Sequence, residues 1–303
     1  MKNFKIILLS LVLTLFVNAC NTKEQKVNNS DFPAIENRYF GEKLPSLTPE
    51  LFAPDILSQD GILEEITYNQ DMKSCYFVRT NGKHNERNFF VIKYKKNLWG
   101  QESKTDIRWP QFSADGNKMF IGKLYRERDG NEWSEPKSSG TFLKYMAHGS
   151  SVSANGTYYF TAYKDRNSIG AIYYSRLING KYEEPIRLND DINRGEYIAG
   201  SMISPDESYL IWNVQKREGG YGQSDLYISF KKNDGTWSKA MNMGPMINTD
   251  MVESSPKISP DGNYFFFIRG EYKLNEDGNR IYIGKQYWVD AKVIENLKPK
   301  GIE

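Results

Sequence analysis

Five short apolar runs recur along the chain, each directly after a turn sequence. They are nearly continuous in aliphatic and aromatic residues and occupy positions 76–78, 119–121, 158–160, 209–212 and 264–268. A short apolar run between turn signals is typical of a strand that is buried on both faces, because a half-buried strand would alternate with polar residues. The pattern therefore predicts five central strands, each covered by neighbouring sheets.

A tight-turn sequence, Ser-Pro-Asp-Gly or a variant of it, precedes each run. Its copies are residues 113–116, 153–156, 204–207 and 259–262, with a degenerate copy at 69–71. Pro favours the first corner, Asp accepts hydrogen bonds from the nearby backbone, and Gly adopts the positive φ that closes the turn. Successive copies are 44, 40, 51 and 55 residues apart, a period typical of the blades of a β-propeller.

Two further repeated elements complete each unit. Asn-Gly or Asp-Gly pairs at 129–130, 179–180 and 234–235 follow the central runs and predict hairpins. The segments 188–193 and 243–248 resemble each other and would lead from an outer strand into the next unit. Each unit can therefore supply four strands, and we expect an all-β propeller of four-stranded blades.

The two ends of the propeller complement each other. Residues 51–57 resemble the segment that follows an outer strand, but no unit precedes them, and the last unit ends at 286–290 without an outer strand. Pairing of these segments would close the ring and cover both open edges. Five repeats with this closure favour five blades, and six blades fit only if residues 85–150 contain a further divergent unit.

The N-terminus predicts export. Lys2 and Lys5 precede an uncharged apolar run at 6–17, and Ala19 precedes Cys20. This arrangement resembles a bacterial lipoprotein signal, in which the cysteine becomes the lipidated first residue of the mature chain. The alternative, an uncleaved membrane anchor, is disfavoured because a run of 12 residues is too short to span a bilayer.

The expected domains follow from these two signals. They are a signal peptide at 1–19, the lipidated Cys20 with a flexible tether at 20–38, the propeller at 39–298 and a tail at 299–303. We expect the protein to be lipid-anchored in the cell envelope, with the outer membrane favoured over the inner and the face of the membrane left open.

Composition and charge exclude several classes of function. Without its first 19 residues the chain has 38 basic and 38 acidic residues, so no excess of positive charge favours nucleic acid. His84 and His148 are far apart without metal-ligand spacing, and no cofactor motif is present. Cys75 lies beside an apolar run and should be a buried, inert thiol. We expect a monomer with no metal, no cofactor and no membrane contact beyond the lipid.

Alignment of the repeats selects a set of positions near one mouth of the central channel. Five residues before each turn copy lie Glu64, Arg108, His148, Ala199 and Ser254, and Glu253 comes one step earlier in the last unit. Polar and charged side chains that converge at a channel mouth suit a sugar or a peptide. The alternative, an ordinary solvated rim, is the favoured interpretation of these positions.

The repeats resemble the bacterial WD-like propeller repeat that is named for its Pro-Asp pair and grouped with TolB-like propellers. Residues 203–211 and 258–267 match its core pattern, and the resemblance extends over about residues 39–298. The ends, at 39–41, 48–54 and 287–292, are similar to those of exported propellers from Bacteroidetes-type bacteria. The resemblance implies a scaffold or binding role and supplies no catalytic residues, while TolB-like propellers usually have six blades.

Two functions remain open at this point. The favoured one is a non-catalytic propeller that binds a glycan, a cell-wall fragment or an envelope protein. The alternative is a glycosidase that uses Glu64 and Glu253, with Arg108 and His148 orienting the substrate, because glycoside hydrolysis needs a pair of carboxyl groups.

Overall fold

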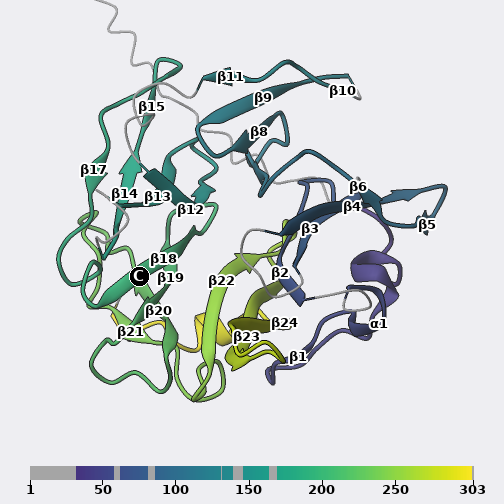
Figure 1. Ribbon diagram of the computed structural model, residues 1–303. Helices are drawn as coiled ribbons and strands as arrows, with labels where there is room; N and C mark the ends of the chain where they lie inside the picture. Colours follow the sequence, from purple (N-terminus) through teal and green to yellow (C-terminus); the bar gives the residue numbers. More distant parts are fainter. Residues whose placement is uncertain are drawn as a thin grey trace, which may run out of the picture.

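The chain folds into antiparallel β-sheets arranged around a centre, as in a β-propeller (Figure 1). The computed structural model describes residues 32–57, 62–80, 86–130, 132–138, 146–163 and 169–301. The expected signal peptide and the expected lipidation site, Cys20, lie outside these residues. The helices of the described part are short: η2 (Arg38–Gly41), α1 (Pro54–Leu57) and α2 (Lys292–Glu295).

Within each of the first three groups of strands, chain order runs from the innermost strand outward. The first group comprises β2 (Ile62–Tyr68), β3 (Ser74–Thr80), β4 (Arg87–Lys95), β5 (Leu98–Trp99) and β6 (Ser103–Lys104). The second comprises β7 (Gln111–Phe112), β8 (Lys118–Ile121), β9 (Leu124–Asp129), β10 (Glu132–Trp133) and β11 (Lys137–Ser138). The third comprises β12 (Met146–Val152), β13 (Tyr158–Tyr163), β14 (Ala171–Ser175) and β17 (Ile186–Arg187), with the side hairpin β15 (Leu177–Ile178) and β16 (Lys181–Tyr182).

The two C-terminal groups are joined by one parallel contact, between Ser224 and Val252. One group comprises β18 (Glu196–Ile203), β19 (Tyr209–Gln215), β20 (Ser224–Phe230) and β21 (Met241–Asn242). The other comprises β22 (Val252–Ile258), β23 (Tyr264–Leu274), β24 (Arg280–Asp290) and β1 (Glu50–Leu51). Innermost strands of neighbouring groups contact one another, β7 with β12, β12 with β18 and β18 with β22, while β2 contacts β24. The innermost strands therefore surround a common centre (Figure 1).

The N-terminal segment pairs with the last strand, as the complementary ends predicted. Glu50 lies opposite Trp288 and Leu51 opposite Tyr287, in antiparallel register. Of the segment 51–57 that was expected to pair, only its start does so, through Leu51 and the backbone N–H of Phe52, which donates to the Gln286 carbonyl at 2.9 Å. Ala53 has a φ of 43°, which ends the strand, and residues 54–57 form α1 because Pro54 suits the first position of a helix.

The folded part of the chain begins before residue 39, the expected start of the propeller. Phe32 is buried, and the Arg38 guanidinium pairs with the Asp261 carboxylate at 3.0 Å. The Tyr39 hydroxyl donates to the same carboxylate at 2.6 Å. Residues 32–38, which were assigned to the tether, thus include side chains that pack against the last group of strands.

The turn motif folds in the way that its residues predict. In the last copy, the Ser259 hydroxyl donates to Asp261 Oδ1 at 2.7 Å and accepts the backbone N–H of Tyr264 at 3.0 Å. The N–H of Gly262, at a φ of 77°, donates to the Ser259 carbonyl at 2.8 Å. The central strand that follows, β23, is buried on both faces over residues 264–268. The motif therefore fixes the step from the innermost strand to the buried central one.

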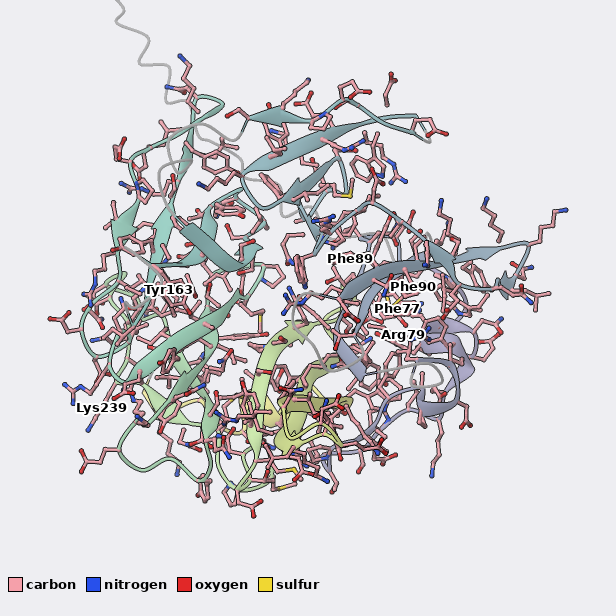
Figure 2. The ribbon with its side chains drawn as sticks, in the orientation of Figure 1. Phe77, Arg79, Phe89, Phe90, Tyr163 and Lys239 are labelled. Atoms are coloured by element: carbon pink, nitrogen blue, oxygen red, sulfur yellow. The ribbon has the colours of Figure 1, made fainter. Side chains whose placement is uncertain are left out.

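A buried arginine holds the N-terminal helix against the first group of strands. Arg79 donates from Nε and Nη2 to the carbonyls of Leu57 and Ile56, each at 3.1 Å, at the C-terminal end of α1. Its guanidinium lies over the stacked rings of Phe77 and Phe90, 4.9 Å and 5.2 Å from their centroids (Figure 2). The positive charge thus satisfies carbonyls that a helix end leaves without partners.

Candidate functional site

A cavity of about 350 Å³ lies at one end of the central channel. Each of the five units contributes to its wall the residue four positions before the turn motif: Glu65, Trp109, Gly149, Gly200 and Ser255. Ligand pockets in proteins commonly have volumes of 300–1,000 Å³, so the cavity is large enough for a small ligand.

The innermost strands are irregular at the level of this cavity. The strand register shifts between Leu63 and Glu65, between His148 and Ser150, and between Ser254 and Lys257, with two further shifts in β18. A bulge inserts an extra residue that stays outside the ladder and re-aims the side chains beside it. Four of the five innermost strands, β2, β12, β18 and β22, are therefore bulged where they border the cavity.

Positive φ angles recur at the same repeat position. The values are 45° at Trp109, 48° at Gly149, 62° at Gly200 and 53° at Ser255. Glycine is required at Gly149, because a Cβ there would lie 2.8 Å from the backbone of Gly200. Neighbouring innermost strands thus approach each other closely at this level, with little or no side chain between them.

The expected site residues are only partly brought together. Ser254 and Ala199 line the cavity, and Arg108 and Glu253 do not. Glu64 and His148 lie on the innermost strands β2 and β12, and their side chains are outside the described part of the structure. The prediction counted five positions back from the turn, whereas the position four back lies in the wall in all five units, and four of the innermost strands are bulged at this level. A fixed count fails here because each bulge shifts the alternation of side chains by one residue.

Arg108 lies outside the wall of the larger cavity, next to the residue that reaches it. Arg108 is exposed, and its guanidinium lies 5.6 Å from the ring centroid of Phe89. Its neighbour Trp109 lines the cavity instead and meets the Phe89 ring edge-on, with centroids 4.8 Å apart. The guanidinium of Arg87, from β4, lies 5.3 Å from the Trp109 ring centroid and also borders the cavity.

Glu253 is a buried structural residue. Its side chain has no exposed surface, and its carboxylate accepts hydrogen bonds from Arg269 Nε at 2.9 Å and from the Thr249 hydroxyl at 2.7 Å. Burial raises the pKa of Glu253, while the contacts with Thr249 and Arg269 oppose this rise. The carboxylate therefore serves the packing of the last group of strands, outside the cavity wall.

One ion pair crosses the floor of the cavity. Lys257 Nζ lies 3.0 Å from a carboxylate oxygen of Glu65 and donates to Gln111 Oε1 at 2.9 Å. These three residues come from three different units, on β22, β2 and β7. Lys257 also lines a second, smaller cavity of about 120 Å³ on the side of the turn motifs. The cluster therefore separates the two cavities along the channel.

The longest hairpin in the described part of the chain, β23–β24, borders the larger cavity. Tyr272 and Tyr282 face each other across this hairpin, with ring centroids 5.2 Å apart, and both line the cavity. Two glycines, Gly270 and Gly284, pair directly between this aromatic part and the buried part of the hairpin. A Cβ on Gly270 would lie 2.4 Å from the Ile283 carbonyl oxygen, so the two strands can pass closely at this point.

Another part of the cavity wall is rich in hydroxyl and amide groups. Ser254, Ser255 and Gln215 contribute to it, and Asn213 Nδ2 donates to the Ser224 hydroxyl at 3.4 Å. Among the described residues, the Ser254 and Ser255 hydroxyls form no hydrogen bond within the protein. Hydroxyl groups can both donate and accept, so this wall is suited to a ligand with several polar groups.

The described residues contain no cluster of three or more His, Cys, Asp or Glu residues that could hold a metal ion. They also contain no helix that is long and apolar enough to cross a membrane. Cys75 is buried, and burial raises the pKa of its thiol.

The sequence matches no protein family model and no curated protein. Among solved structures, it is similar to a glycoside hydrolase at 10% identity, with 88% of this chain and 95% of that chain covered and a TM-score of 0.49. It is similar to a gluconolactonase from Xanthomonas campestris at 10% identity, with 80% and 87% covered and a TM-score of 0.45. A third similarity is to the hydrazine synthase of Kuenenia stuttgartiensis, at 14% identity and a TM-score of 0.39. The alignment covers 71% of this chain and 65% of that one, which is less than two thirds of the synthase chain.

Proposed function

We propose that the chain is an exported, lipid-anchored propeller of five blades that binds a polar ligand in the larger cavity without converting it. The ligand would be a glycan, a cell-wall fragment or an exposed part of an envelope protein. One observation carries the proposal: all five repeats bring the same repeat position to the wall of a single cavity.

The strand groups support the count of five blades. Each group contains one copy of the turn motif and one buried central strand, and β1 supplies an outer strand to the last group. Closure by an N-terminal strand joins the first and last blades of a propeller and removes an open edge. Five copies of the motif and five groups of strands agree with this count.

The charged groups of the cavity favour binding over glycoside hydrolysis. Hydrolysis by the common mechanisms needs two carboxyl groups on either side of the scissile bond. Glu65 is the one acidic side chain that lines the cavity among the described residues, and it is paired with Lys257. Glu253, half of the pair considered for hydrolysis, is held by Arg269 and Thr249.

A ligand screen with the full-length protein in detergent tests this proposal. Soluble glycans, cell-wall fragments and envelope peptides would be titrated by calorimetry, and each mixture would be analysed for products. We expect saturable binding of at least one polar ligand without turnover. Ser254→Trp should abolish this binding, because the indole would fill space beside a hydroxyl that lines the cavity.

A matched control separates the cavity from the rest of the surface. Gln101→Trp places the same indole in the exposed loop between β5 and β6 and should leave binding unchanged. Turnover of any bound ligand would refute the non-catalytic role. Binding that survives Ser254→Trp in a folded protein would place the ligand elsewhere.

The lipid anchor is a separate part of the proposal and rests on the sequence around Cys20. Cys20→Ala should abolish labelling by a radioactive fatty acid and release the protein from the membrane fraction. The matched control is Cys75→Ala, since these are the two cysteines of the chain and Cys75 is buried. Unchanged membrane association of Cys20→Ala would exclude lipid anchoring at this residue.

A further inference from the structure

We propose that the smaller cavity, at the turn-motif end of the channel, is a second binding site that takes the N-acetyl group of a small neutral molecule. This inference goes beyond the proposed function, because it concerns the other side of the cluster that Lys257, Glu65 and Gln111 form across the channel. Three observations on the wall of the smaller cavity carry it.

The first observation is an amide donor on the cavity wall. Gln111 is 9% exposed and lines the smaller cavity. Its Oε1 accepts a hydrogen bond from Lys257 Nζ at 2.9 Å, and a lysine can only donate, so the amide nitrogen is the group that remains. Within the described part of the chain, nothing accepts a hydrogen bond from this nitrogen.

The Gln111 nitrogen is also accessible. It is not among the fully shielded, unpartnered side-chain atoms of the described residues, so its surface is open to the cavity that Gln111 lines. A ligand that displaces water from a donor in a confined site must supply an acceptor in its place, since an unpaired polar group is costly. The nitrogen therefore selects a ligand with an acceptor such as a carbonyl oxygen.

The second observation is that other polar side chains on this wall can accept a hydrogen bond. Thr67 on β2 and Gln70 in the first turn motif line the smaller cavity, and among the described residues no group forms a hydrogen bond with either side chain. An amide combines a carbonyl acceptor with an N–H donor and so matches both kinds of group. Since the charge of Lys257 is compensated by Glu65 at 3.0 Å, the wall suits a neutral ligand.

The third observation is the size and the apolar character of the rest of the cavity. The second residue of the turn motif borders it in four units, and one of these residues, Pro205, is exposed, so the cavity opens between the turns. Its volume of about 120 Å³ is below the roughly 300–1,000 Å³ usual for whole ligands, and a cavity of about 150 Å³ can hold benzene. The cavity therefore fits one group of a few atoms, whose methyl would pack on Phe112, Met202 and Ile258.

Ligand-observed NMR with the full-length protein in detergent tests this site, because it detects weak binding of small molecules. The probes are N-methylacetamide, methyl acetate, which lacks the N–H, and benzene, which lacks both polar groups, with protein-free micelles as the blank. We expect N-methylacetamide to bind at least about fivefold more tightly than either of the others. N-acetylglucosamine and N-acetylalanine methylamide present the same group on a sugar and on an amino acid, and their relative affinities identify its source.

Gln111→Glu tests the donor. The new carboxylate can still accept the hydrogen bond from Lys257, but it replaces the nitrogen with an oxygen that repels a carbonyl group. It should weaken binding of N-methylacetamide by at least about tenfold and leave benzene unaffected. Gln101→Glu is the matched control, because it adds the same charge in the exposed loop between β5 and β6 and should change neither affinity.

A second pair of variants tests the location. Ala114→Trp places an indole where the second turn motif borders the cavity, and it should abolish binding of all the probes. Ala154→Trp is the matched control, because Ala154 occupies the same position of the third turn motif but is exposed and does not line the cavity. It should leave binding unchanged, and circular dichroism shows whether each variant keeps its β-structure.

Several results would overturn the inference. Binding of benzene without binding of the amides would show a purely apolar cavity, and no binding of any amide would exclude an N-acetyl site. Amide binding that is unchanged in a folded Gln111→Glu or Ala114→Trp variant would place the probe elsewhere. Loss of amide binding in Ser254→Trp with retention in Ala114→Trp would place it in the larger cavity. None of these results bears on the proposed function, which the ligand screen tests separately.

Discussion

The carboxylate of Glu253 and the guanidinium of Arg269 form an ion pair at 2.9 Å between residues that lie directly opposite each other on β22 and β23. Arg269 Nη2 also donates to the Ile247 carbonyl at 2.8 Å, and the Arg269 guanidinium lies 4.7 Å from the ring centroid of Tyr287. The pair therefore ties the segment before β22 to the last two strands. Its burial indicates a role in stability, and this role can be separated experimentally from ligand binding.

Glu253→Gln should lower the free energy of unfolding by roughly 3 kcal/mol, because it leaves the largely buried charge of Arg269 without its partner. Chemical denaturation measures this change. The affinity for a cavity ligand should stay the same, since Glu253 does not line the cavity. A variant of unchanged stability that has lost binding would reverse this assignment.

Glu207 provides a pH-dependent contact between two units. Its carboxylate accepts hydrogen bonds from Lys231 Nζ at 2.7 Å, the Ser153 hydroxyl at 2.9 Å and the Tyr159 hydroxyl at 3.2 Å. Burial alone would raise the pKa of Glu207, but hydrogen bonds from Lys231, Thr157 and Ser153 outweigh it and hold the pKa below its usual value. A carboxylate with a lowered pKa in the folded state stabilises the fold above its unfolded pKa.

Glu207→Gln should therefore lower the free energy of unfolding by about 1–3 kcal/mol at neutral pH. The difference in unfolding free energy between Glu207→Gln and the wild type should shrink as the pH falls below 4.5, the usual pKa of a glutamate. It should vanish once the pH has fallen through the lower pKa that Glu207 has in the folded protein. Denaturation curves at several pH values measure this, with the exposed Glu276→Gln as control. A difference that grows as the pH falls would contradict the assigned direction of the shift.

The contact between Gly149 and Gly200 makes the bulged wall of the cavity sensitive to a single methyl group. Gly149→Ala should lower the free energy of unfolding by about 1 kcal/mol because alanine disfavours the positive φ at this position. The added Cβ would also clash with the Gly200 backbone, which should cost roughly 1–3 kcal/mol more. Gly262→Ala is the control, because Gly262 has a φ of 77° and no atom within 4 Å of an added Cβ. It should cost only about 1 kcal/mol. Equal effects of the two variants would show that the innermost strands do not meet at this level.

The pairing of β1 with β24 predicts that the N-terminal segment contributes strongly to stability. Phe52 is 1% exposed, with its ring centroid 5.0 Å from that of Phe266 and 4.9 Å from that of Trp288. Phe52→Ala should lower the free energy of unfolding by about 3–5 kcal/mol. Leu51→Ala, at the neighbouring exposed position, should change it by less than about 0.5 kcal/mol. Thermal and chemical unfolding measure both changes. Equal losses of stability in Phe52→Ala and Leu51→Ala would argue against packing of Phe52 in the core.

The sequence alone determined the elements that depend on local chemistry. The turn motif, exemplified by Ser259, Asp261 and Gly262, closes through contacts between residues at most five positions apart, so its residues predict its shape. The continuous apolar run after it predicted a strand buried on both faces, which β23 is over residues 264–268. Complementary ends of the chain also predicted the pairing of β1 with β24, because an unpaired outer edge is unfavourable.

Only the tertiary structure decided which residues reach the cavity. Trp109, with its φ of 45°, reaches the wall while Arg108 stays outside, and bulges shift the side chains of β12 and β18 at the same level; no local pattern marks these irregularities when neighbouring strands impose them. Burial of Glu253 likewise depends on Arg269 and Thr249, which the repeat alignment does not relate to it. Tyr272 and Tyr282 escaped the alignment because β23 and β24 are longer than the corresponding strands that the structure describes in the other units. The repeat thus encodes the scaffold through local turns and apolar runs, and the cavity arises where strands from distant parts of the sequence meet.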